Sequence, residues 1–188
     1  MRKIILAINV TPEGFCDHRT VIADDELHQF YSHLLKNADT ILFGRKTFQL
    51  MDPYWPLVAK NKTGTKAEIE FAQLLDEIQK IVFSKKGITT EWKNTTVLNE
   101  LNRAELLKWK QEAGKDILVG SPGITDQLTQ LGLIDEYYFL VQPMIAGNGK
   151  RFFETTKLDT PIHLSLRDTR PFNSGAVALC YRRTNRKG

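Results

Sequence analysis

Short apolar runs alternate along the chain with stretches whose apolar residues recur every three or four positions. The uninterrupted run at 3–10 is typical of a strand that is covered on both faces. The stretch 24–37 has helical spacing and an acidic start, which suits the positive end of a helix. The pattern predicts strands at 3–10, 40–43, 80–83, 95–98, 116–119, 136–142, 162–168 and 176–182, and helices at 24–37, 66–77, 103–113 and 123–131.

The order of these elements predicts the fold class. Strands separated by helices imply βαβ crossovers and a mostly parallel sheet. The last two strands have no helix between them, so we expect them to pair antiparallel, and we expect a loop through Pro53, Pro56 and Gly64. The sequence therefore predicts one α/β domain over residues 1–188, with helices on both faces of a mixed, mostly parallel sheet.

Composition and charge narrow the classes of partner. With 41% hydrophobic and 26% charged residues, the chain is typical of a folded globular protein. The net charge is +4, but its cations cluster only at the C-terminal tail, Arg182, Arg183, Arg186 and Lys187, which we interpret as a solvated chain end. No basic stripe with interleaved aromatic residues occurs, so no nucleic-acid partner is expected.

Cysteine spacing and hydropathy bear on the compartment. Cys16 and Cys180 lie far apart without CxxC or matching histidine spacing, so neither a disulfide framework nor a metal site is predicted. No apolar run approaches the roughly 20 residues that cross a bilayer, so no membrane partner is expected. These features predict a cytoplasmic location.

Three strand ends carry glycine, hydroxyl and cationic residues together. They are Gly44-Arg45-Lys46-Thr47, Ser84-Lys85-Lys86 and Gly120-Ser121-Pro122-Gly123. Ligands of open α/β sheets bind at the carboxyl ends of strands, and glycine and helix N-termini suit phosphate. Each segment by itself is equally compatible with an ordinary polar turn; together they predict a site for an anionic ligand.

Several motifs follow one another in order over nearly the whole chain. They are Thr11-Pro12-Glu13-Gly14-Phe15, Ile41-Leu42-Phe43-Gly44-Arg45-Lys46-Thr47-Phe48, Tyr54-Trp55-Pro56, Val82-Phe83-Ser84-Lys85, the stretch from Ile117 to Glu136, and Pro143-Met144-Ile145-Ala146-Gly147-Asn148-Gly149. In this order they resemble the dihydrofolate reductase superfamily, and more closely its bacterial stand-alone branch related to the reductase domain of RibD.

The resemblance implies an NADPH-dependent reductase that transfers hydride to a small heterocycle, such as the riboflavin-pathway pyrimidine 5-amino-6-(5-phosphoribosylamino)uracil. It also implies a homodimer, which agrees with the unpaired or apolar edge that we expect at the aromatic strand 136–142 and the later strands. The implied cofactor residues are Gly44, Arg45, Lys46, Thr47, Ser84, Lys85, Gly120, Ser121, Gly123 and Ile124. The implied substrate residues are Asn9, Tyr54 and Trp55.

The proton donor is the point at which the chain departs from the family pattern. Glu13 borders the implied site, where a partly buried carboxyl would have a raised pKa and relay a proton; a solvated turn acid is the alternative. The acid of folate-reducing members corresponds by spacing to His28, with Asp25 as the acid nearby. A non-catalytic ligand-binding protein and a true dihydrofolate reductase therefore stay open as alternatives.

Overall fold

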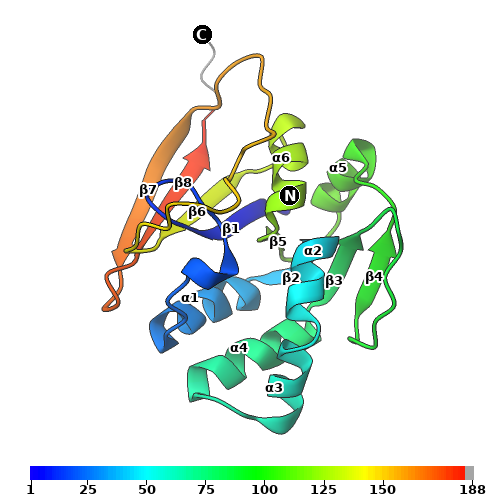
Figure 1. Cartoon of the computed structure of the whole chain (residues 1–188). Coiled ribbons are helices and arrows are strands. Elements are labelled where there is room, and N and C mark those ends of the chain that lie inside the picture. The colour runs from blue at the N-terminus through cyan, green and yellow to red at the C-terminus, as the bar shows by residue number, and fades with distance from the viewer. Residues whose placement is uncertain (185–188) are drawn as a thin grey trace.

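The computed structural model describes residues 1–184 as eight strands and six α-helices, with one short 3₁₀ helix, His18–Thr20 (Figure 1). The strands are β1 (Ile4–Val10), β2 (Ala38–Gly44), β3 (Gln79–Phe83), β4 (Thr95–Leu98), β5 (Asp116–Val119), β6 (Glu136–Val141), β7 (Leu164–Pro171) and β8 (Val177–Arg183). The helices are α1 (Asp25–Lys36), α2 (Arg45–Met51), α3 (Trp55–Asn61), α4 (Lys66–Glu77), α5 (Arg103–Gln111) and α6 (Pro122–Gln130). None of the helices within these residues is long and apolar enough to cross a membrane.

All eight strands form one sheet in the order β4-β3-β2-β5-β1-β6-β8-β7. The pairings from β4 through to β6 are parallel, whereas β8 pairs antiparallel with both β6 and β7. The predicted mixed, mostly parallel sheet is thus confirmed. Because β1 and β2 flank β5, their carboxyl ends meet near the middle of one sheet edge.

Side chains that alternate along the buried strands build two separate cores. Ile5 and Ala7 face a core shared with α1 and α4, while Ile4 and Leu6 face the core that contains residues of α5 and α6. Figure 1 shows α1, α3 and α4 lying together, away from α5 and α6. This three-layer arrangement follows from the period of two along a strand.

The segment predicted as a loop through Pro53, Pro56 and Gly64 contains the additional helix α3, and the helix α2 before it was not among the predicted helices either. Pro56 stands in its first turn, where the missing N–H costs nothing. Val58, three residues after Trp55, is buried. The prediction of a loop was wrong because the two prolines and Gly64 suggested a break. Pro53 and Gly64 lie outside α3, and Pro56 is tolerated in its first turn.

Two expectations about the C-terminal strands also need correction. Arg182 and Arg183 are not part of a solvated tail: they belong to β8, where the guanidinium of Arg182 contacts Glu136 at 3.0 Å and Arg183 donates to a backbone carbonyl. Arg186 and Lys187 lie outside the described residues. The strand at 136–142 leaves no free edge either, because β6 is paired on both sides and β7 forms the edge.

A buried lysine joins the end of α4 to β3. Lys80 is fully buried, and its Nζ donates to the carbonyl oxygens of Leu75 at 2.9 Å, Asp76 at 3.0 Å and Ile78 at 2.8 Å. The ammonium lies 4.9 Å from the ring centroid of Trp92. Burial lowers the pKa of Lys80 to about 8. The side chain therefore satisfies carbonyl groups that a helix end leaves without partners.

Candidate functional site

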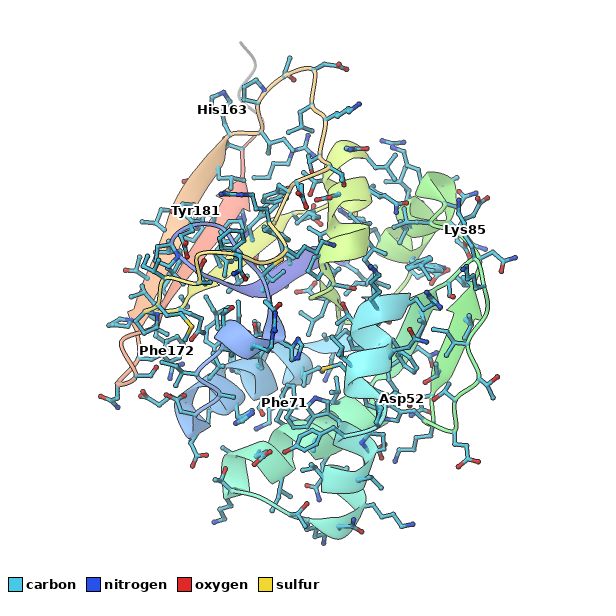
Figure 2. All side chains as sticks on the ribbon, in the orientation of Figure 1. Asp52, Phe71, Lys85, His163, Phe172 and Tyr181 are labelled. Atoms are coloured by element: carbon cyan, nitrogen blue, oxygen red, sulfur yellow. The ribbon has the colours of Figure 1, made fainter. Side chains whose placement is uncertain are left out.

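A cavity of about 890 Å³ opens at the carboxyl ends of the central strands. Its volume is within the range of cofactor and substrate pockets, about 300–1,000 Å³. Twelve of the residues predicted for cofactor or substrate line it: Asn9, Gly44, Arg45, Lys46, Thr47, Tyr54, Trp55, Lys85, Gly120, Ser121, Gly123 and Ile124. Phe71 also lines the cavity, and Figure 2 shows it well apart from Lys85, so the cavity has a cationic end and an aromatic end.

Ser121 connects two of the predicted junctions. Its Oγ accepts the N–H of Gly44 at 2.8 Å and donates to Oγ1 of Thr47 at 2.8 Å. The residue is buried, with 1% of its surface exposed. The hydroxyl is used in this way instead of capping α6. The turn after β5 and the start of α2 are therefore held together as one wall of the cavity.

The glycines of this wall have different reasons for lacking a side chain. A Cβ on Gly44 would lie 3.0 Å from Oγ of Ser121, and one on Gly120 would lie 3.1 Å from the carbonyl oxygen of Ala7. A Cβ on Gly123 would meet nothing within 4 Å, because this glycine faces open cavity at the start of α6. The open space beside a helix N-terminus fits a pyrophosphate group.

Aromatic side chains from three helices form the other end of the cavity. The rings of Trp55 (α3) and Phe71 (α4) meet edge to face with centroids 4.7 Å apart. His28 of α1 lies against both, at 5.9 Å and 5.7 Å. One turn further along α1, Tyr31 also lines the cavity. Flat apolar walls of this kind suit a planar ring and exclude water.

His28 and Tyr31 are wall residues that sequence reasoning did not assign to the site. His28 was only the position at which an acid was missing, and Tyr31 was only one of the apolar residues with helical spacing. Nδ1 of His28 is buried without a hydrogen-bond partner among the described residues, and burial lowers the pKa of the imidazole. The two residues are three positions apart, which places both side chains on one face of α1. This spacing was the signal in the sequence that could have assigned them to the same wall.

Glu13 has a different environment from the one predicted. Its carboxylate accepts the backbone N–H groups of Ala146 at 2.6 Å and Gly147 at 2.9 Å, and it does not line the cavity. These hydrogen bonds hold its pKa below the usual value, so the predicted raised pKa was wrong. In this structure Glu13 fixes the loop after β6 to the turn after β1.

Two further predicted residues lie away from the cavity wall. Asp25 is exposed and accepts a hydrogen bond from Oγ1 of Thr65, so the structure does not bring it to the aromatic end. Ser84 is buried, and its hydroxyl donates to the carbonyl of Gly87 at 3.0 Å. Ser84 closes the turn after β3. Of the predicted segment Ser84-Lys85-Lys86, only Lys85 lines the cavity.

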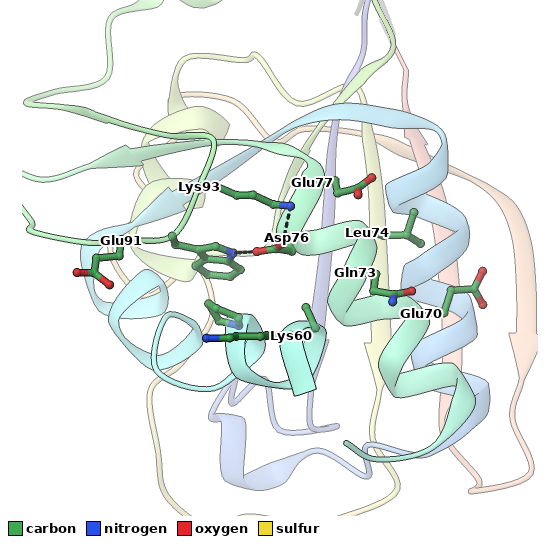
Figure 3. A pocket seen from close by; sticks show the side chains of 11 residues that line it. Lys60, Glu70, Gln73, Leu74, Asp76, Glu77, Glu91 and Lys93 are labelled. Atoms are coloured by element: carbon green, nitrogen blue, oxygen red, sulfur yellow. Dashed lines mark hydrogen bonds and ion pairs between the residues drawn. The ribbon is translucent and has the colours of Figure 1, made fainter. Parts of the chain in front are cut away.

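A second cavity of about 850 Å³ lies between α3, the end of α4 and the segment 91–93 (Figure 3). Its central carboxylate, Asp76, accepts from Nε1 of Trp92 at 3.0 Å and pairs with Nζ of Lys93 at 2.7 Å. These partners are all within the protein. The contacts in Figure 3 therefore explain this carboxylate as part of the packing between α4 and the strand connection.

The order of strands and the position of the cavity define a dihydrofolate-reductase-like α/β protein. Residues 3–178 match the model of the RibD C-terminal domain, and the chain belongs to this family. It is 34% identical over 190 residues to the protein YyaP of Bacillus subtilis (strain 168), covering 96% of this chain and 94% of the relative.

Two solved structures show the same fold at low sequence identity. One is a putative riboflavin biosynthesis protein from Shewanella sp. PV-4, with a TM-score of 0.72 and 13% identity over 98% of this chain and 100% of that chain. The other is dihydrofolate reductase from Enterococcus faecalis complexed with NADP(H), with a TM-score of 0.60 and 13% identity over 97% of both chains.

Proposed function

We propose that this protein is an NADPH-dependent reductase of a small heterocyclic compound. The observation that carries the proposal is the single cavity that joins glycine and cationic residues at the ends of β2, β3 and β5 to an aromatic end formed by α1, α3 and α4. One end suits phosphate groups and the other suits a flat ring. Membership of the RibD C-terminal family supports this proposal.

We assign different residues of the cavity wall to different groups of NADPH. Arg45 and Lys85 are the cations that we assign to the 2′-phosphate, and Lys46 and Thr47 to phosphate oxygens. The backbone turn from Gly120 to Gly123 takes the pyrophosphate. The open space at Gly123, where an added Cβ would meet no atom within 4 Å, supports this assignment.

The substrate binds at the aromatic end in this proposal. NADPH supplies a hydride when it is bound, and the protein aligns the substrate carbon that accepts it and keeps water away. Tyr54 and Trp55 form one side of this end, and Asn9 lies at the end of β1. The riboflavin-pathway pyrimidine 5-amino-6-(5-phosphoribosylamino)uracil is the first substrate that we would test, because the family model and the Shewanella structure point to that pathway.

Oxidation of NADPH in the presence of this pyrimidine tests the proposal. We expect saturable loss of the nicotinamide absorbance that requires both compounds. The variant Arg45→Gln should raise the KM for NADPH about tenfold, because one charge-assisted hydrogen bond is lost. The matched control is Lys86→Gln, since Lys86 is exposed and does not line the cavity. Binding of NADPH without reduction of the pyrimidine would contradict the choice of this substrate. Failure to bind NADPH would contradict the proposal that the protein is an NADPH-dependent reductase.

A further inference from the structure

A buried serine hydroxyl lies between two turns of the cavity wall. Oγ of Ser121 is 2.8 Å from the backbone nitrogen of Gly44 and 2.8 Å from Oγ1 of Thr47. Ser121 stands at the N-cap of α6, where a serine usually accepts an N–H of the first helical turn. Its side chain makes no such hydrogen bond. The hydroxyl of Ser121 therefore acts on the start of α2 and leaves the start of α6 to other groups.

The direction of both hydrogen bonds follows from the chemistry of the groups. The backbone N–H of Gly44 can only donate, so Oγ of Ser121 accepts from it. The proton of Ser121 is buried, and Oγ1 of Thr47 is its only acceptor among residues 1–184. A buried hydroxyl proton without an acceptor is costly, so Ser121 donates to Thr47. Thr47 is thus the acceptor in this pair and keeps its own proton for a further partner.

The hydroxyl of Thr47 is a hydrogen-bond donor in the cavity wall. Thr47 is half-buried and lines the cavity. A threonine in a helix often donates to the carbonyl oxygen four residues earlier, which here is that of Phe43. Within residues 1–184 the Thr47 hydroxyl makes neither this hydrogen bond nor any other as a donor. The described part of the protein therefore leaves this proton to a ligand.

A second donor without a partner lies at the start of α6. Pro122 is the first residue of this helix and has no N–H, and the N–H of Ile124 donates to the carbonyl oxygen of Ser121 at 3.2 Å. The N–H of Gly123 between them has no acceptor among the described residues, and Gly123 is exposed in the cavity wall. A Cβ on Gly44 would lie 4.0 Å from the backbone nitrogen of Ile124, so the starts of α2 and α6 adjoin.

We infer that Ser121 is a positioning residue for the pyrophosphate of the bound dinucleotide. Its own hydroxyl is fully engaged within the protein, so it acts through Thr47. By donating to Oγ1 of Thr47, it keeps the Thr47 proton for a phosphate oxygen. Because it does not cap α6, it also leaves the N–H of Gly123 for the same pyrophosphate. The inference rests on the proposed function, since it places the pyrophosphate of NADPH at this wall.

Calorimetric titration with two ligands tests the donor at Thr47. NADPH carries the pyrophosphate, whereas adenosine 2′-monophosphate carries the 2′-phosphate without a pyrophosphate. Thr47→Val has nearly the same shape but no hydroxyl, so it should weaken NADPH about tenfold and leave adenosine 2′-monophosphate within about twofold. Thr47→Ser keeps the hydroxyl and should bind NADPH within about threefold of the original protein.

The role of Ser121 is tested by combining substitutions. Ser121→Ala should weaken NADPH about as much as Thr47→Val, because the released hydroxyl of Thr47 then donates to the carbonyl oxygen of Phe43. Both substitutions together should weaken NADPH no more than about twofold beyond Thr47→Val, whereas a serine that only supports the wall gives losses that multiply to about a hundredfold. Ser121→Cys places a weaker donor in the same space and should show the same lack of additivity if Ser121→Ala does not fold.

The matched controls are Ser32→Ala and Thr129→Val, because both residues are buried and neither lines the cavity. They should leave the affinities for both ligands unchanged. Unaltered NADPH affinity in Thr47→Val or Ser121→Ala, or losses that multiply in the double variant, would overturn the inference while leaving the reductase intact. An equal loss of affinity for both ligands would overturn it too, because adenosine 2′-monophosphate has no pyrophosphate. Failure of the original protein to bind either NADPH or adenosine 2′-monophosphate would instead contradict the proposed function.

Discussion

The substitution Gly123→Ala separates the stability of the protein from its affinity for the cofactor. Gly123 is the second residue of α6, and its backbone lies outside the left-handed region that favours glycine. An added Cβ meets no protein atom within 4 Å. Alanine is the better helix former by about 0.8–1.0 kcal/mol in a helix interior, so the free energy of unfolding should stay the same or rise by up to about 1 kcal/mol.

The same methyl group would occupy the space that we assign to the pyrophosphate of NADPH. Losing one charge-assisted hydrogen bond costs about 1.5–3 kcal/mol, so NADPH affinity should fall roughly tenfold to hundredfold. Urea denaturation and calorimetric titration measure the two quantities. Gly120→Ala provides the contrast: its Cβ would lie 3.1 Å from a backbone oxygen, and such overpacking costs about 1–3 kcal/mol of stability. Unchanged NADPH affinity in a stable Gly123→Ala protein would refute the placement of the pyrophosphate.

Three further results are expected. Lys80→Met should lower the free energy of unfolding by about 2–4 kcal/mol in urea denaturation, because the carbonyls that Lys80 satisfies lose a charged donor; the exposed Lys60→Met is the control, and an equal effect of both would contradict this reason. Dihydrofolate should support little NADPH oxidation, because α1 contributes His28 to the cavity wall and its acid Asp25 does not line the cavity; turnover of several per second that collapses in Asp25→Asn would contradict it. The protein should be a homodimer in light scattering at tens of micromolar, since β7 is an edge strand with Leu166 half exposed; a monomer at that concentration would contradict this.

The layers of the fold could be predicted because local periodicity determines them. The helix 66–77 has the predicted bounds, since its apolar residues repeat with the helical period. The strand 95–98 also has the predicted bounds, as a short run rich in β-branched residues. The helix α3 was missed because Pro53, Pro56 and Gly64 suggested a break, although Pro56 stands in the first turn of the helix, where proline is tolerated.

The glycine-rich part of the site could be predicted from its place at strand ends, whereas the hydrogen bonds of individual side chains could not. Glu13 was expected to have a raised pKa, but two N–H groups from more than a hundred residues away lower it. Tyr31 lies on the predicted helix, but its hydroxyl accepts a hydrogen bond from Asn9, which is held in turn by Gln142, 133 residues further along the chain. Such long-range partners have no local signature in the chain.

Calorimetric titration with NADPH and with NADH tests the central claim most directly. Lys85 and Arg45 line the cavity, and we predict that NADPH binds about tenfold to hundredfold more tightly than NADH because these cations contact its 2′-phosphate. Lys85→Gln should remove most of this preference, and the exposed neighbour Lys86→Gln should retain it. Equal affinities for the two nucleotides, or no binding of either, would contradict the account.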